Sequence, residues 1–72
     1  MAVTFTVIFV GLDGRVYLGS TSSESVLRSY LDRCRNEGWP MCLVLVKGAN
    51  MLERPLLLLS RQTNGTYRER RW

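Results

Sequence analysis

The chain has 72 residues, and a domain of this size buries only about 60% of the surface that its unfolded form exposes. Apolar residues make up 46% of the sequence and charged residues 22%, a composition that excludes intrinsic disorder. The net charge is +4 and there is no histidine, so the commonest general base and the commonest zinc ligand are both absent. A chain this short usually needs a disulfide, a metal or a partner chain to stabilise it.

The longest uninterrupted apolar run covers only residues 41–46, and the chain does not start with a basic segment followed by an apolar one. We therefore expect no membrane association, no secretory signal and a cytoplasmic location. Cys34 and Cys42 lack the spacing of a metal site and lie in apolar contexts. We expect them to be buried free thiols, with a disulfide as the alternative.

The first predicted element is a strand over residues 3–10, which are rich in β-branched and aromatic side chains. Asp13-Gly14 is typical of a two-residue hairpin turn, and residues 16–19 follow as a second strand. Such a turn places Val10 opposite Tyr17, and opposed residues point to the same face. On this register one face carries Val3, Phe5, Val7, Phe9, Val16 and Leu18, and the other carries Thr4, Thr6, Ile8, Val10 and Tyr17.

The next predicted element is a helix that ends near Asn36. Thr21 and Glu24 have the spacing of a capping box, with Thr21 as the N-cap. Gly38 is expected to end the helix in the left-handed conformation, and Pro40 prevents its continuation. The apolar residues with the spacing of one helical stripe are Val26, Leu27, Tyr30, Leu31 and Cys34.

Two further strands are predicted at residues 41–47 and 56–59. Asn64-Gly65 indicates a second hairpin, so residues 66–70 are expected to form a short strand or else a basic tail. The fold class is therefore α+β, in the order ββαββ(β), with one mainly antiparallel four- or five-stranded sheet and a single helix on one face. Residues 1–62 are expected to form the domain, and residues 63–72 the C-terminal strand or tail.

Both faces of this sheet carry apolar residues, and one helix cannot cover both. The second layer could come from curling of the sheet with the tail folded back through Tyr67 and Trp72, from a second copy of the chain, or from another protein. Because the chain is so short, intermolecular burial is the favoured interpretation.

Catalysis is not expected. Neither cysteine has a histidine to activate it, and the carboxylates are scattered along the chain with no pair predicted to converge. The sequence contains no P-loop and no dinucleotide fingerprint. We therefore predict no catalytic residue, no metal and no cofactor.

The basic charge lies at the C-terminal end. Residues 1–60 carry six basic and five acidic side chains, whereas residues 61–72 carry four arginines and one glutamate. Arginines interleaved with Tyr67 and Trp72 are typical of proteins that bind single-stranded nucleic acid. The alternative is a solvated tail that prevents aggregation of a small apolar protein.

The length, the two hairpin signals and the single helix resemble those of small phage-encoded proteins that bind and inhibit host machinery, including anti-CRISPR proteins. By analogy, this overall pattern implies a non-enzymatic protein-binding regulator or inhibitor. The alternative is a small nucleic-acid-binding module that uses the arginine-rich C-terminus. The expected partner is another protein or a second copy of the chain, a homodimer. The predicted partner-binding residues are Ile8, Val10, Tyr17, Leu57, Leu59, Arg61, Tyr67, Arg68, Arg70, Arg71 and Trp72.

Overall fold

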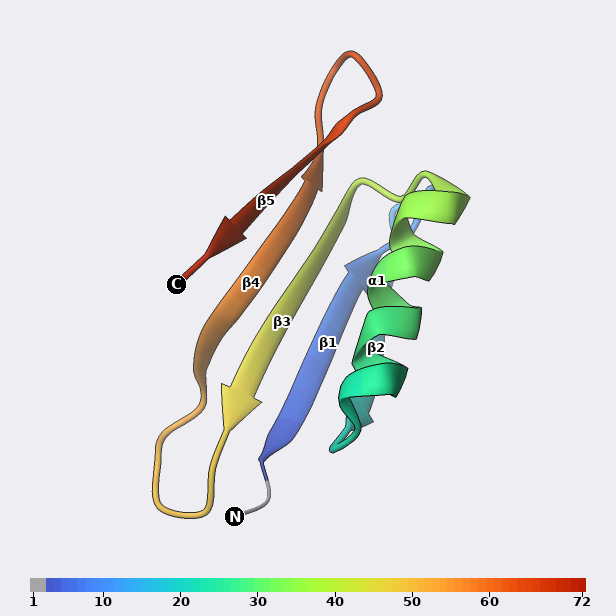
Figure 1. Ribbon diagram of the computed structural model, residues 1–72. Coiled ribbons are helices and arrows are strands. Elements are labelled where there is room, and N and C mark those ends of the chain that lie inside the picture. Colours follow the sequence, from blue (N-terminus) through green and yellow to red (C-terminus); the bar gives the residue numbers. More distant parts are fainter. Residues whose placement is uncertain (1–2) are drawn as a thin grey trace.

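The computed structural model describes residues 3–72 and confirms the predicted α+β fold, with one helix and a five-stranded antiparallel sheet (Figure 1). Residues 1 and 2, where a secretory signal would begin, lie outside the described part. The strands are arranged in the order β2-β1-β3-β4-β5, so β3 is the central strand. The elements are β1 (Thr4–Val10), β2 (Val16–Thr21), α1 (Glu24–Glu37), β3 (Met41–Lys47), β4 (Arg54–Arg61) and β5 (Tyr67–Arg71). The C-terminal segment is thus a strand of the sheet.

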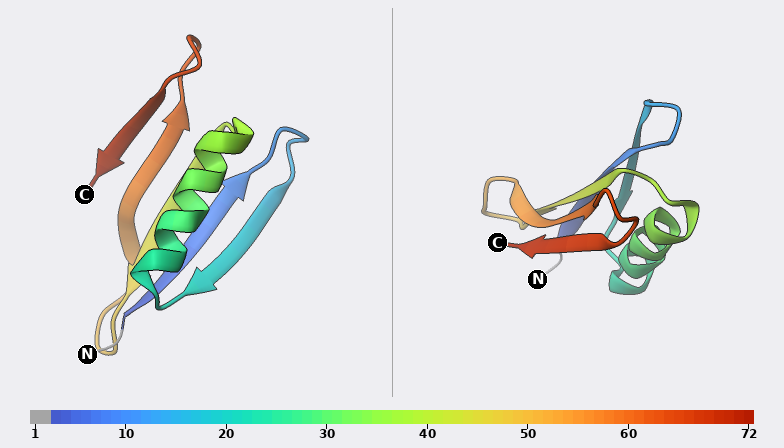
Figure 2. Two further views of the ribbon diagram at one scale, coloured as in Figure 1. Left: turned by 45° about the vertical axis from the view of Figure 1, so that its right-hand side comes forward. Right: turned by 90° about the horizontal axis from the view of Figure 1, so that it is seen from above.

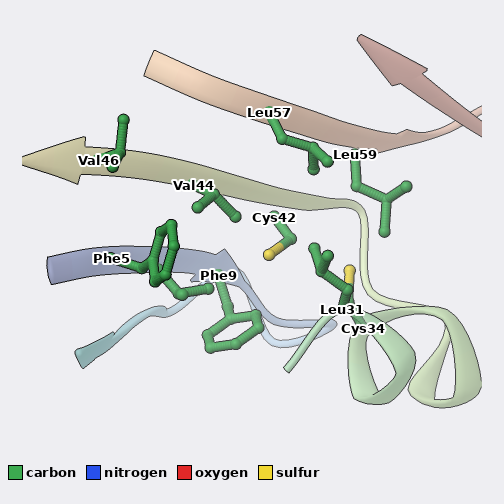
Figure 3. Close-up of a cluster of buried hydrophobic side chains, with 10 residues drawn as sticks. Phe5, Phe9, Leu31, Cys34, Cys42, Val44, Val46, Leu57 and Leu59 are labelled. Carbon is green, nitrogen blue, oxygen red and sulfur yellow. The ribbon is translucent and has the colours of Figure 1, made fainter. Parts of the chain in front are cut away.

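The helix lies on one face of the sheet, where it packs over β1, β2 and β3 (Figure 2). The core forms between α1 and this face, which we call the helix face (Figure 3). Its buried members are Phe5, Val7, Phe9, Leu31, Cys34, Cys42, Val44, Val46, Leu57 and Leu59. Cys34 and Cys42 are buried free thiols, as predicted. Within residues 3–72, no helix has the length and apolar composition needed to cross a membrane.

The predicted helix is confirmed, but the predicted N-cap residue, Thr21, is wrong. Ser23 is the N-cap, and its hydroxyl accepts a hydrogen bond from the Val26 amide at 3.3 Å. Thr21 cannot take this role because it is still the last residue of β2, paired with Phe5. At the other end, Gly38 has φ +70° and donates to carbonyls of the last turn, as predicted.

The first hairpin has a three-residue loop, one residue longer than predicted. The Gly11 amide donates to the Arg15 carbonyl at 2.9 Å, and Gly14 is the loop residue with positive φ, at +78°. This geometry is a type I turn followed by a left-handed glycine. The longer loop shifts the pairing by one residue, so Ile8 lies opposite Leu18. A shift of one residue moves every side chain of a strand to the other face.

A bulge interrupts the pairing of β3 with β4. Val44 pairs with Leu57 but Leu45 pairs with Pro55, so Leu56 is the extra residue. Proline has no amide hydrogen to donate to the ladder, which fits its place beside the bulge. Leu56 and Leu57 therefore both line the helix-side hollow described below.

Candidate functional site

The face of the sheet opposite α1 has no second layer in the described chain. We call this surface the open face. Its residues are positioned by the antiparallel pairing, because directly opposed residues point to the same side. The apolar members are Ile8 and Val10 of β1, Val16 and Leu18 of β2, Met41, Leu43 and Leu45 of β3, and Leu58 of β4.

These side chains form rows that run across the strands. One row consists of Leu18, Ile8, Leu43 and Leu58 and continues to Arg70 on β5. The members on inner strands are half-buried against each other, whereas Leu18 on the edge strand is 74% exposed. Four aliphatic residues side by side on a solvated face are unusual for a sheet that functions alone.

The β5 edge of the open face is basic. Arg68 and Arg70 alternate with Glu69, which points to the helix face, and the guanidinium of Arg70 lies 4.7 Å from the centre of the Trp72 ring. Between β4 and β5, a shallow hollow of about 370 Å³ is bordered by Leu58, Ser60, Arg68 and Arg70. The open face thus combines an aliphatic centre with a cationic edge.

Three of the predicted binding residues lie on the opposite face from the one expected. Tyr17 pairs with Phe9, so it lies on the helix face. There its ring stacks on that of Trp39, with 6.1 Å between the ring centroids. This prediction was wrong because the hairpin loop has three residues. Leu57 and Leu59 are buried core residues, since their partners on β3 point toward α1. The uniform leucine run gave no alternation that could assign their face.

The C-terminal residues are divided between the two faces. Arg61 donates from Nη1 to the Gly38 carbonyl at 3.0 Å, and Arg71 donates from Nε to Glu69 at 2.9 Å, both on the helix face. The Tyr67 hydroxyl donates to the Cys34 and Trp39 carbonyls at 3.1 and 2.6 Å. The hydrogen bonds of Arg61 and Tyr67 stabilise the C-terminal end of α1, so these two residues have a structural role.

An aromatic cluster beside α1 was missed in the sequence. The Phe9 ring packs edge-on against Tyr30 at 5.5 Å and against Trp39 at 5.1 Å. Tyr17 extends the cluster, and its hydroxyl donates to Asp13 at 2.9 Å. The hydrogen bonds from the Arg15 amide and from Tyr17 lower the pKa of Asp13 below its usual value. The aromatic residues are too far apart in sequence to have indicated this cluster.

A second hollow, of about 300 Å³, lies between α1 and the helix face of β4, with a largely apolar floor. At its charged rim, Arg28 pairs with Glu24 at 3.8 Å, and Arg71 pairs with Glu69 of β5, outside the hollow, at 2.9 Å. Each basic group at the rim is thus already paired with a carboxylate.

The described residues also show no activated nucleophile. Burial raises the pKa of the Cys34 thiol, and burial together with the neighbouring Cys34 raises that of Cys42 to about 12. Both thiols are therefore neutral at physiological pH and unreactive. Among residues 3–72, no three acidic or cysteine side chains gather as ligands for a metal ion.

Comparison of the chain with protein-family models, with curated proteins and with solved structures found no match. The proposed function therefore rests on the surface itself.

Proposed function

We propose that this chain is a small non-enzymatic regulator that binds another protein chain through the open face. The observation that carries the proposal is the group of eight aliphatic side chains on a sheet face without a second layer. Burying such side chains is the main favourable term in protein association, and the Arg68–Arg70 edge supplies polar contacts at the rim.

The exposed area supports the same proposal. A compact monomer of 8.3 kDa is expected to expose about 4,600 Å². The described fold exposes 5,035 Å². An area above the expected one fits a molecule in which one sheet face is left for a partner. Inhibition of a host protein in the cytoplasm, which the overall pattern suggests by analogy, is a role that such a surface would support.

Nucleic-acid binding is the second candidate, and one observation favours it. Arg68, Arg70 and Trp72 lie together at the β5 edge, where two cations and a ring could contact a phosphate and a base. The pairing pattern weakens it, because Arg61 and Arg71 point to the helix face and hold structural contacts. Two arginines beside an aliphatic surface fit the rim of a protein interface better.

A comparison of charge-matched variants in an affinity capture tests the proposal. The tagged chain, Ile8→Glu and Ser29→Glu are each incubated with extract from cells of the source organism, and the captured chains are identified by mass spectrometry. Ser29 is exposed on α1, so Ser29→Glu adds the same charge away from the open face. We expect wild type and Ser29→Glu to retain one common partner, or a second copy of the chain, that Ile8→Glu loses.

Circular dichroism must show that all three proteins are folded. Equal capture by Ile8→Glu and Ser29→Glu would contradict the proposal. Retention of nucleic acid alone, removed by moderate salt, would favour the second candidate.

A further inference from the structure

We infer that the partner on the open face is a second copy of this chain, bound face to face about a two-fold axis that runs along β3. The inference rests on the proposed function, because it assigns the occupant of the same surface. A two-fold interface must be self-complementary: where one residue meets another, the reverse contact is made as well. The order of the strands and the placement of the arginines on the open face bear on this requirement.

The self-complementary contacts follow from the central position of β3 in the sheet. The strand order has two strands on each side of β3, so rotation about an axis along β3 places β1 over the partner's β4 and β2 over the partner's β5. In the row described above, Ile8 then faces Leu58 of the second copy and Leu18 faces Arg70, while Leu43 meets its own copy on the axis. Every aliphatic residue of the row gains an apolar contact, because the stem of an arginine is itself aliphatic.

The two halves of the face also differ in relief in a complementary way. On the β2 side, the edge-strand residues Val16 and Leu18 leave 62% and 74% of their surface exposed. On the β5 side lies the hollow of about 370 Å³ bordered by Leu58 and Arg70. The same rotation brings the exposed aliphatic side chains of β2 in each copy over the hollow of the other. Two sheets packed in this way form a sandwich with strands nearly aligned.

The placement of Arg68 and Arg70 favours this axis over the other arrangement that keeps the strands of the two sheets aligned. A two-fold axis perpendicular to the strands would place β5 on β5 and bring the Arg68–Arg70 edge of one copy against that of the other. Like charges opposed across an interface are strongly unfavourable. The axis along β3 separates the two cationic edges to opposite sides of the sandwich, where each guanidinium can reach water past the edge of β2. The one like-charge pair that it opposes is Lys47 with its own copy, at the exposed end of β3.

Sedimentation velocity over a concentration series, followed by crosslinking with a short bismaleimide, tests the inference. Three single-cysteine additions are used, at Leu18, at Arg70 and, as a control, at Ser29 on the exposed side of α1. The native thiols are buried, and wild type gives the background reaction. We expect a concentration-dependent dimer that Leu43→Glu abolishes.

In an equimolar mixture of Leu18→Cys and Arg70→Cys, we expect the crosslink between the two different variants to dominate over either self-crosslink, and Ser29→Cys to stay at background. Self-crosslinks of Arg70→Cys in excess would overturn the assigned axis. A wild-type monomer at every concentration would overturn the dimer.

The two proposals fail separately. A monomeric chain whose captured partner is lost on Ile8→Glu refutes the dimer and leaves the proposed function standing. A monomeric chain whose capture is unaffected by Ile8→Glu refutes both.

Discussion

Truncating two adjacent leucines of β4 tests the assignment of the two sheet faces. Leu59 is fully buried beneath the helix face, and Leu58 is half-buried on the open face. Leu59→Ala removes core methyl groups and leaves a cavity, which costs about 3 kcal/mol of unfolding free energy. A 72-residue domain has a total stability of roughly 4–11 kcal/mol, so this one change removes a large share of it.

The matched control is Leu58→Ala, which removes the same atoms from the next position. In the monomer we expect it to cost about 1 kcal/mol or less, because Leu58 has no layer above it. Urea unfolding followed by circular dichroism, at a concentration low enough for the chain to be monomeric, gives both values. Equal losses for the two variants, or a larger loss for Leu58→Ala, would refute the face assignment.

Three further outcomes are expected. Tyr67→Phe should lower the unfolding free energy by about 1–2 kcal/mol in urea titration, because the carbonyls of Cys34 and Trp39 lose their shared donor; an unchanged midpoint would exclude a structural role for the hydroxyl. Burial raises the pKa of Cys42 in the folded chain to about 12, above its usual value of 9.0, so stability present below pH 9 should fall as the pH rises toward 12, and Cys42→Ala should flatten this decline. If Arg68 and Arg70 bound single-stranded nucleic acid, two phosphate contacts would give a log–log salt slope of about −1.4; we expect no measurable binding in an oligonucleotide titration at low salt.

The order of the elements could be predicted because each has a strong local signal. The strand at residues 3–10 is indicated by its own alternation. The end of the helix is indicated by Gly38, and the two turns by the two Asx-Gly pairs. Each of these signals depends only on neighbouring residues. The capping residue was misplaced by two positions, because Thr21 and Ser23 have the same chemistry and only the pairing of β2 decides between them.

The face of the sheet on which each side chain lies could not be predicted with the same certainty, because it depends on the number of residues in a turn. Asp13-Gly14 is compatible with a two-residue loop and with the three-residue loop that the structure shows. That single residue decides on which face Tyr17 lies. For Leu57 and Leu59 the deciding factors are the pairing with β3 and the bulge at Leu56, which involve residues more than ten positions away.

The candidate site was predicted in part. Ile8 and Val10 lie on the open face as expected, and Arg68 and Arg70 lie at its edge. Their role as binding residues stays a prediction. Alternation along a strand places Arg68 and Arg70 on one face and Arg71 on the other. The sequence predicts either a strand or a tail for this segment, so this division could not be predicted.

The most direct test of the face-to-face dimer is the access of solvent to the open face in solution. Methyl resonances of Ile8, Leu43 and Leu58 are recorded with a soluble paramagnetic probe at low and at high protein concentration, with the exposed Val26 of α1 as the reference. We expect the three open-face residues to become shielded from the probe as the concentration rises, while Val26 keeps its full relaxation enhancement. Equal enhancement of the open-face methyls at every concentration would contradict it.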